Sequence, residues 1–108
     1  MRIIARRTLF RYVAARAGQK DQAALKAALG AWFDEVRKAR WTSSADVKAR
    51  YRTASIISSE RVVFNIKGND YRLVVAIDYE KGIVWIKWIG SHAAYDKIDA
   101  RNVEHGCS

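Results

Sequence analysis

Residues 62–96 read VVFNIKGNDYRLVVAIDYEKGIVWIKWIGSHAAYD. This stretch holds three runs rich in valine, isoleucine and aromatic residues, separated by turns at Gly68-Asn69 and at Glu80-Lys81-Gly82. Apolar runs of this length, broken by glycine-containing turns, predict an antiparallel meander of three strands. The polar side chains inside the runs are the informative ones, because the strands would pack without them.

The register of the first hairpin follows from a two-residue turn at Gly68-Asn69. One face of this hairpin is then wholly apolar, and the other carries two polar side chains directly opposite each other. The predicted pairs are Ile66 with Tyr71, Asn65 with Arg72, Phe64 with Leu73, and Val62 with Val75.

The second hairpin decides on which face Lys87 lies. A turn at Glu80-Lys81 places Lys87 on the face of Arg72, whereas a three-residue loop would set it in the core, opposite Val75. We favour the first register because an unpaired buried ammonium costs several kcal/mol. It predicts the pairs Ile77 with Val84, Val75 with Ile86, and Leu73 with Trp88, and a polar face bearing Asn65, Arg72 and Lys87 beside Val63, Val74 and Trp85.

The residues before the meander predict one strand and two helices. Ile3 and Ile4 favour a short edge strand, and Thr8 is a suitable N-cap for a helix that ends at Gly18. A longer helix is predicted over about 21–39, with one apolar stripe formed by Leu25, Leu29, Trp32 and Val36. A helical turn is expected at 45–48, capped by Ser43 or Ser44. The predicted fold is α+β, with an N-terminal edge strand and two helices packed on one face of the meander.

The C-terminal region predicts a short helix that begins after Ser91 as its N-cap. On this helix His92, Tyr95 and Asp96 fall at positions i, i+3 and i+4, which form one patch on one face. The tail at 104–108 has no pattern and is expected to be frayed. The whole chain, 1–108, is expected to form one domain.

The charge of the chain is strongly asymmetric. The 108 residues carry a formal net charge of +9, and all of the excess lies in residues 1–53. Such a basic half favours a polyanionic partner, either nucleic acid or an acidic protein. The single cysteine, Cys107, has no intrachain partner and fits a reducing compartment, so a cytoplasmic location is expected. No apolar run is long enough to predict a membrane span or signal sequence.

A basic row precedes the meander, where residues 48–55 read KARYRTAS. In an extended chain Lys48, Arg50 and Arg52 would point the same way, with Tyr51 between two of them. Cations beside an aromatic ring can hold phosphates while a base stacks, as in single-stranded RNA binding. A charged loop without a ligand is the alternative interpretation.

The polar groups of the meander and the last helix suit phosphodiester chemistry. A metal site is not expected, because the two histidines are far apart and the only cysteine lies in the tail. RNA cleavage needs a base for the 2′-hydroxyl, an acid for the leaving 5′-oxygen and cations for the phosphorane. His92 is the one side chain of the cluster whose ordinary pKa lies near neutrality. A partly exposed structural histidine is the alternative, as is an Arg72 ion pair with Asp70 or Asp78.

The segments VVFNIKGNDYRLVVAI, GSHAAYDKID and WTSSADVKARYR resemble the HigB toxins of bacterial toxin-antitoxin modules, within the RelE/ParE superfamily. The resemblance extends from Ile3 to about Asp99, and the closing His-x-x-Tyr-Asp motif is its most specific part. It implies a curved sheet with helices on one side and an RNA-facing concavity on the other. It also implies a ribosome-associated mRNA endonuclease that is neutralised by a helix-turn-helix, HigA-like antitoxin. No cofactor is expected, and the toxin and antitoxin are expected to form a hetero-oligomer.

By matched position, the resemblance implies that Arg72 binds phosphate and that His92, Tyr95 and Asp96 form the C-terminal active-site motif. The register adds Lys87 to the catalytic residues. The residues expected to contact RNA are Lys48, Arg50, Arg52, Asn65 and Lys67.

Two other functions fit the same residues. A ParE-like toxin would share the fold and inhibit DNA gyrase without cleaving RNA. A plain nucleic-acid-binding module would use the basic half electrostatically and bind duplex DNA with a steep salt dependence. Mapping of new RNA 5′ ends after brief expression separates both from an endoribonuclease.

Overall fold

The computed structural model describes residues 1–104 and 106–107. Its elements, in chain order, are β1 (Arg2–Ile4), α1 (Arg6–Ala15), α2 (Gln22–Lys38), α3 (Ser44–Arg50), β2 (Ser55–Ile56), β3 (Arg61–Ile66), β4 (Tyr71–Asp78), β5 (Ile83–Ser91), α4 (His92–Tyr95) and β6 (Gly106–Cys107).

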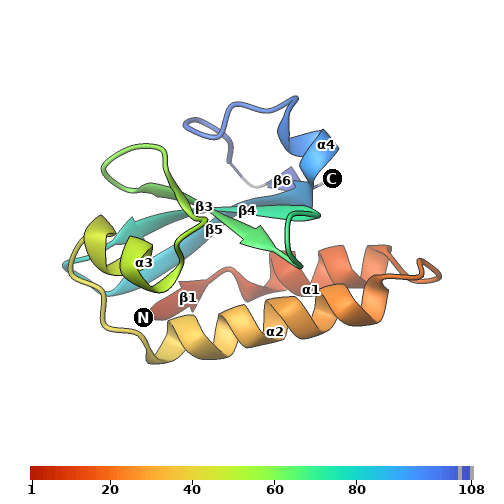
Figure 1. Ribbon diagram of the computed structural model, residues 1–108, viewed down its shortest axis with the longest axis horizontal. Coiled ribbons are helices and arrows are strands. Elements are labelled where there is room, and N and C mark those ends of the chain that lie inside the picture. The colour runs from red at the N-terminus through yellow and green to blue at the C-terminus, as the bar shows by residue number, and fades with distance from the viewer. Residues whose placement is uncertain (105, 108) are drawn as a thin grey trace.

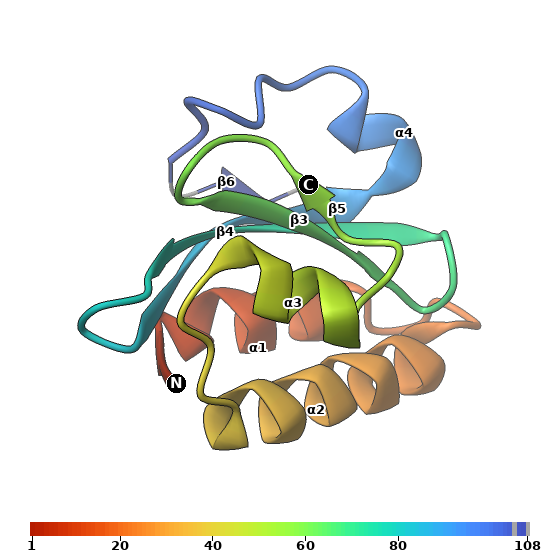
Figure 2. The ribbon, with the colours of Figure 1, turned by 60° about the vertical axis from the view of Figure 1, so that its left-hand side comes forward.

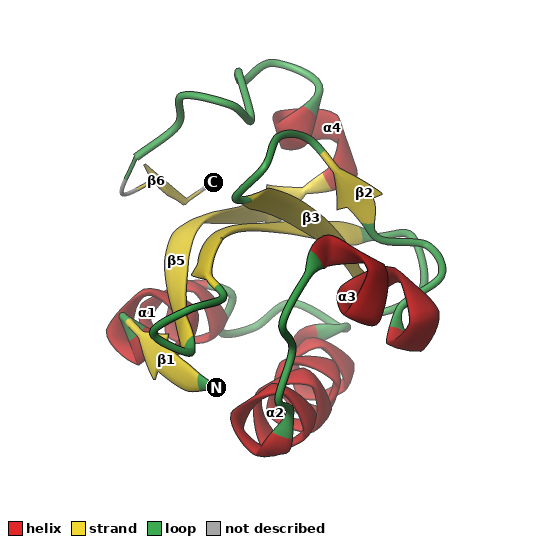
Figure 3. Cartoon of the chain, turned by 90° about the vertical axis from the view of Figure 1, so that its left-hand side faces the viewer, coloured by secondary structure: helices red, strands yellow, loops and turns green. Residues whose placement is uncertain are grey.

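One mixed sheet forms the centre of the molecule. Its strand order is β1-β5-β4-β3-β2, and β6 also pairs with β5. The pairs within the meander are antiparallel, whereas β1 and β6 run parallel to β5. Figure 1 shows α1 and α2 on one side of this sheet and α4 on the other, and Figure 3 shows the same layers from the left-hand side. The chain is therefore α+β, as predicted.

The two long helices cover the inner face of the sheet. The buried residues of α2 are Leu25, Leu29, Trp32 and Val36, which is the predicted stripe. The α1 helix begins at Arg6, two residues before the predicted cap at Thr8, and Ala5 precedes it without a side-chain cap. No helix in the described part of the chain is long and apolar enough to cross a membrane.

The inner core is built around Phe64 of β3. The ring of Trp32 meets it edge-on at 5.4 Å, and the ring of Tyr51 does so at 5.0 Å. Trp41 stacks on it at 6.3 Å. These contacts join α2, β3 and the segments on both sides of α3, which lies beside the sheet in Figure 2. Aromatic rings of this size dominate the energy of a small core.

The first hairpin has the predicted register. Ile66 pairs with Tyr71, Asn65 with Arg72, Phe64 with Leu73, and Val62 with Val75. The second hairpin begins as predicted, with Ile77 opposite Val84 and Val75 opposite Ile86.

A β-bulge then shifts the second register. Between Val74 and Val75 the pairing slips, so that Val74 lies opposite Trp88 and Leu73 lies opposite Ile89. The predicted pair of Leu73 with Trp88 is therefore wrong. A bulge places two residues of one strand against one of its partner, which exchanges the faces of the residues beyond it. Trp88 consequently lies on the outer face, and Ile89 takes its place in the inner core.

The outer face carries a second, smaller core. Val63, Val74 and Trp88 are buried there beneath the C-terminal segment, which contributes Tyr95, Ile98, Ala100 and Val103. We expected an open concavity on this side, and part of it is covered by 98–104. Glu104, which we expected in a frayed tail, makes two ion pairs, and Gly106–Cys107 pair with β5. His105 and Ser108, which belong to the same predicted tail, lie outside the described residues.

Candidate functional site

Arg72 lies on the outer face at the start of β4, and its guanidinium is held in a fixed orientation. Nη1 donates to the main-chain oxygen of Asn69 at 2.9 Å, and Nη2 donates to the Asn69 side-chain oxygen at 2.8 Å. The guanidinium carbon also lies 5.9 Å from the centre of the Tyr95 ring. Hydrogen bonds on one edge and an aromatic face beside it restrict a side chain that otherwise has many rotamers.

The turn between β3 and β4 provides these partners. Lys67 and Gly68 both have positive φ, at 54° and 65°, and the amide of Asp70 donates to the Lys67 carbonyl at 3.3 Å. Positive φ is common for glycine and uncommon for lysine. The Lys67 ammonium closes the turn through an ion pair with Asp70 at 2.7 Å, so its charge is already partly neutralised.

The α4 helix brings the C-terminal motif to this turn. Ser91 caps the helix as predicted, its hydroxyl accepting from the Ala94 amide at 3.1 Å. The His92 amide donates to the Asp70 carbonyl at 2.9 Å, which fastens the start of α4 to the turn that holds Arg72.

The side chains of the motif form one exposed patch. Nε2 of His92 lies 3.8 Å from Oδ2 of Asp96, and these side chains are 48% and 66% exposed. The Tyr95 ring lies between Arg72 and the buried Trp88, whose ring centre is 6.2 Å away. Of the predicted catalytic residues, the structure therefore brings Arg72, His92, Tyr95 and Asp96 together, and Asn65 lies across the ladder from Arg72.

Lys87 does not join this patch. It follows Ile86 at the bulge, and its ammonium binds Oε2 of Glu104 at 2.8 Å. Arg72 pairs with Gly90, three residues farther along β5, which is roughly 10 Å of strand. The hydrogen bond from Lys87 is the main cause of the lowered pKa of Glu104. The predicted position of Lys87 on the outer face is correct. Its ammonium, however, forms an ion pair with Glu104, a residue expected in the frayed tail.

Arg61 is the polar residue that sequence reasoning missed. The residue is only 6% exposed; its side chain donates to the Val103 carbonyl at 2.7 Å and to Glu104 at 2.6 Å. Strand alternation from Asn65 through Val63 places Arg61 on the outer face, and this alternation could have identified Arg61 from the sequence. The partners in 103–104 could not be inferred because that segment showed no pattern. Arg61 and Lys87 together fasten the C-terminal segment over the outer face.

The extended geometry predicted for the basic row is wrong. Residues 48–50 belong to α3, because Val47 is fully buried and Asp46 binds the amide and hydroxyl of Thr42 before the helix. The Lys48 ammonium donates to the carbonyls of Arg52 and Ala54, and Arg50 forms an ion pair with Glu35. The three cations therefore do not form an extended row.

A partly buried polar cluster lies on the opposite face, away from this patch. The Tyr71 hydroxyl donates to Asp21 at 2.5 Å, and the Arg16 guanidinium lies 5.2 Å from the Tyr71 ring centre. Burial, and next the bond to Asp21, raise the pKa of Tyr71 to about 12. The same bond is the main cause of the lowered pKa of Asp21. This cluster joins the α1–α2 connection to β4 and is structural.

Comparison with known families defines the class of the protein. The model of the HigB_toxin family, described as a RelE-like toxic component of a toxin-antitoxin system, matches residues 25–98. The protein is therefore a RelE-like toxic component of a toxin-antitoxin system. Within that class, the chain belongs to the HigB toxin family. The match runs from α2 to the residues just after α4 and so includes the whole patch around Arg72. No curated protein matches the chain.

Proposed function

We propose that this toxin is a ribosome-associated endoribonuclease that cleaves translated mRNA. The observation that carries the proposal is the exposed patch in which a fixed guanidinium, an aromatic ring and a histidine–carboxylate pair lie within one small region. These are the groups that cleavage through the 2′-hydroxyl requires. Membership of a RelE-like toxin family supports the same activity.

The proposed reaction uses the RNA itself as the nucleophile. The 2′-oxygen attacks the adjacent phosphorus as its proton is removed, and the bond from phosphorus to the 5′-oxygen breaks as that oxygen gains a proton. The products are a 2′,3′-cyclic phosphate and a 5′-hydroxyl. The Arg72 guanidinium can bind two non-bridging oxygens and stabilise the charge of the phosphorane.

His92 is assigned to proton transfer and Asp96 to its orientation. Their separation of 3.8 Å shortens to a hydrogen bond with a small change in either exposed side chain. Tyr95 lies near Trp88 and Arg72, and we assign it to stacking on a base or orienting the 2′-hydroxyl. Asn65, which lies across the ladder from Arg72, and Lys67 are assigned to contacts with the RNA. Lys87 was assigned to the same phosphate, but its bond to Glu104 restricts it to a structural role in this proposal.

The family implies an antitoxin as partner. We propose that this antitoxin is a HigA-like, helix-turn-helix protein and that the two form a hetero-oligomer in the cytoplasm. The basic first half of the chain suits approach to the ribosome, whose surface is rich in phosphate.

Growth arrest on expression tests the assignment of the site. We expect His92→Ala and Arg72→Ala each to restore growth while the far-ultraviolet circular dichroism stays that of the parent. Both side chains lie outside the two cores, so the variants should stay folded, with a loss of about 1 kcal/mol for Arg72→Ala through its hydrogen bonds. Lys81→Ala, an exposed charge in the distant β4–β5 turn, is the matched control and should remain toxic. Full toxicity of both site variants at equal expression would show that the site lies elsewhere.

A further inference from the structure

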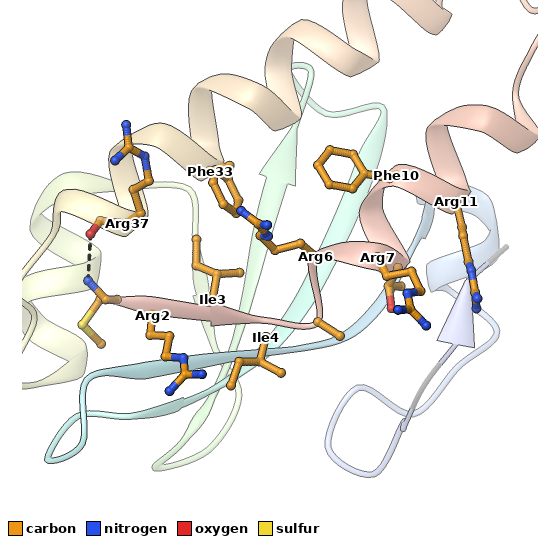
Figure 4. Close-up of a pocket in the computed structure, with 12 residues that line it drawn as sticks. Arg2, Ile3, Ile4, Arg6, Arg7, Phe10, Arg11, Phe33 and Arg37 are labelled. Atoms are coloured by element: carbon orange, nitrogen blue, oxygen red, sulfur yellow. Dashed lines mark hydrogen bonds between the residues drawn. The ribbon is translucent and has the colours of Figure 1, made fainter.

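An arginine-rich pocket lies where β1 meets α1 and the end of α2, as Figure 4 shows. Its volume is about 990 Å³, and none of its twelve lining residues, all of them described, is acidic. The arginines of this pocket are Arg2, Arg6, Arg7, Arg11 and Arg37. Most of the pocket comes from residues 1–11, which lie outside the range matched by the family model.

Most of this charge has no neutralising partner. In the part of the chain that the structure describes, Arg2, Arg7 and Arg11 have no carboxylate within ion-pair distance. Arg37 has only an exposed contact with Asp34 at 3.5 Å, and Arg6 lies over the Phe33 ring at 5.3 Å. Like charges so concentrated repel one another, and an anionic ligand would relieve that repulsion.

An apolar groove adjoins the pocket and runs between α1 and α2. Its volume is about 690 Å³, and its apolar lining includes Leu9, Val13 and Leu29. Phe10 and Phe33 line both the groove and the pocket, so the two form one continuous surface. Phe10 is 67% exposed, the highest value for a large hydrophobic residue among those described. An exposed ring between an apolar groove and a cationic rim is typical of a protein-binding hot spot.

We propose that this surface binds an acidic, amphipathic helix of a protein partner. The apolar side chains of that helix would lie in the α1–α2 groove against Phe10, and its glutamates or aspartates would face Arg7 and Arg11. RNA is the less suitable occupant, because its phosphates would use the arginines but nothing in it would cover a groove lined by Leu9, Val13 and Leu29. The helices α1 and α2, which line this surface, lie on one side of the sheet, whereas α4, which carries His92 and Tyr95, lies on the other (Figure 1). The inference therefore does not depend on the proposed nuclease activity.

Binding of designed peptides to the full-length protein tests this proposal. The first probe is an amphipathic peptide of about four helical turns, with leucines on one face and glutamates beside them. The second has the same leucines and lysines in place of the glutamates, and the third has the same glutamates and serines in place of the leucines. A single-stranded oligouridylate is the nucleic-acid probe. Affinity is measured by fluorescence anisotropy and peptide helicity by circular dichroism.

We expect only the first peptide to bind and to become helical. The variants Phe10→Ala and Arg7→Gln/Arg11→Gln should each weaken it by about tenfold or more. Arg101→Gln, an exposed arginine of the C-terminal segment, should leave it unchanged. The proposal is overturned if the acidic peptide does not bind, if the lysine or serine peptide binds equally well, or if Arg7→Gln/Arg11→Gln weakens only the oligouridylate. Growth arrest by the Phe10→Ala variant reports separately on the nuclease proposal and should persist.

Discussion

At the scale of single residues, Arg72 has the geometry that the proposal requires of a phosphate-binding side chain. Its two terminal nitrogens donate to Asn69, and its plane lies near the ring of Tyr95. The alternative suggested by the sequence, an ion pair with Asp70 or Asp78, does not form: Asp70 binds Lys67, and Asp78 accepts from the Lys81 amide. Among the described residues no carboxylate forms an ion pair with Arg72, so the proposal can assign its charge to a phosphate.

This geometry predicts that charge alone is insufficient at this position. Arg72→Lys keeps a cation but loses the planar fork that binds two oxygens. We expect the rate of RNA cleavage to fall by about 100-fold, since removing one well-placed donor from a transition state has that effect. Single-turnover cleavage by purified protein on programmed ribosomes measures it. Arg101→Lys is the matched control, and equal rates for Arg72→Lys and the parent would contradict the proposed role.

The bond between Tyr71 and Asp21 predicts a stability difference that depends on pH. The folded pKa of Asp21 is lowered, so its contribution is present above the unfolded value near 4 and is lost as pH falls through the folded pKa. The folded pKa of Tyr71 is raised to about 12, so its contribution is present below about 10 and is lost as pH rises from there to about 12.

Tyr71→Phe should therefore be less stable than the parent by about 1–2 kcal/mol near pH 7. The difference should shrink below about pH 4 and above about pH 10. Urea unfolding at a series of pH values measures this difference. A difference that stays constant across the whole range would show that the hydroxyl contributes through packing and not through its bond to Asp21.

At the scale of elements, α2 contains a glycine that the backbone does not require. Gly30 lies in the middle of the helix, has no positive φ, and a Cβ added there would meet no heavy atom within 4 Å. We expect Gly30→Ala to raise the free energy of unfolding by about 0.5–1 kcal/mol, because alanine loses less conformational entropy in a helix.

Gly82 provides the matched control for this prediction. A Cβ there also meets nothing within 4 Å, but Gly82 has φ of 70° in the β4–β5 turn. Gly82→Ala should therefore destabilise the protein, because L side chains rarely adopt that conformation. Thermal unfolding of the two variants separates the effects, and shifts of the same sign would contradict this explanation.

The C-terminal segment is the element whose position sequence reasoning could not supply. Arg61 binds the Val103 carbonyl and Glu104, and Lys87 binds Glu104 as well. Arg61→Ala should cost about 1–3 kcal/mol through these hydrogen bonds. It should also raise the hydrogen exchange of residues 98–104, while exchange in α2 follows global stability. Arg101→Ala serves as the control, and unchanged exchange at 98–104 in Arg61→Ala would show that the segment is held by its apolar contacts alone.

Strand alternation and helical periodicity predicted most of the secondary structure. The stripe of α2 and the register of the first hairpin were correct because each rests on several buried residues that agree. The bulge at Lys87 was not predicted, because one extra residue in a strand leaves no signal in the residue types of that strand. Only the packing of Trp88 and Ile89 decides the position of the bulge. The extended geometry predicted for Lys48, Arg50 and Arg52 was wrong for a related reason. Burial of Val47 favours a helix, whereas the prediction relied on the alternation of the three cations.

For the candidate site, the local spacing of the motif predicted which side chains lie together. The partners that come from distant parts of the chain could not be predicted. The spacing of His92, Tyr95 and Asp96 and the cross-strand position of Arg72 placed four residues in one patch. The removal of Lys87 from that patch depends on Glu104, seventeen residues away in a segment without periodicity. A contact between residues so far apart could be recognised only after the fold was known.

At the scale of the whole molecule, the two sides of the sheet carry different surfaces. The outer side carries the patch around Arg72 and His92, and the helix side carries the arginine pocket and the apolar groove. The excess positive charge in residues 1–53 belongs mainly to the helix side and to α3, whereas the candidate site lies in the electrically balanced second half. The proposed nuclease activity therefore depends on a few positioned side chains and not on the net charge of the chain.

The most direct test of the central claim is a map of RNA 5′ ends after brief expression in growing cells. We predict new 5′-hydroxyl ends within translated messages, which disappear when translation initiation is blocked and are absent for both Arg72→Ala and His92→Ala. Growth arrest without new RNA ends, accompanied by DNA gyrase inhibition, would contradict the claim and indicate a toxin that acts by binding. New ends that persist in both variants would show that the chemistry lies outside the patch formed by Arg72, His92, Tyr95 and Asp96.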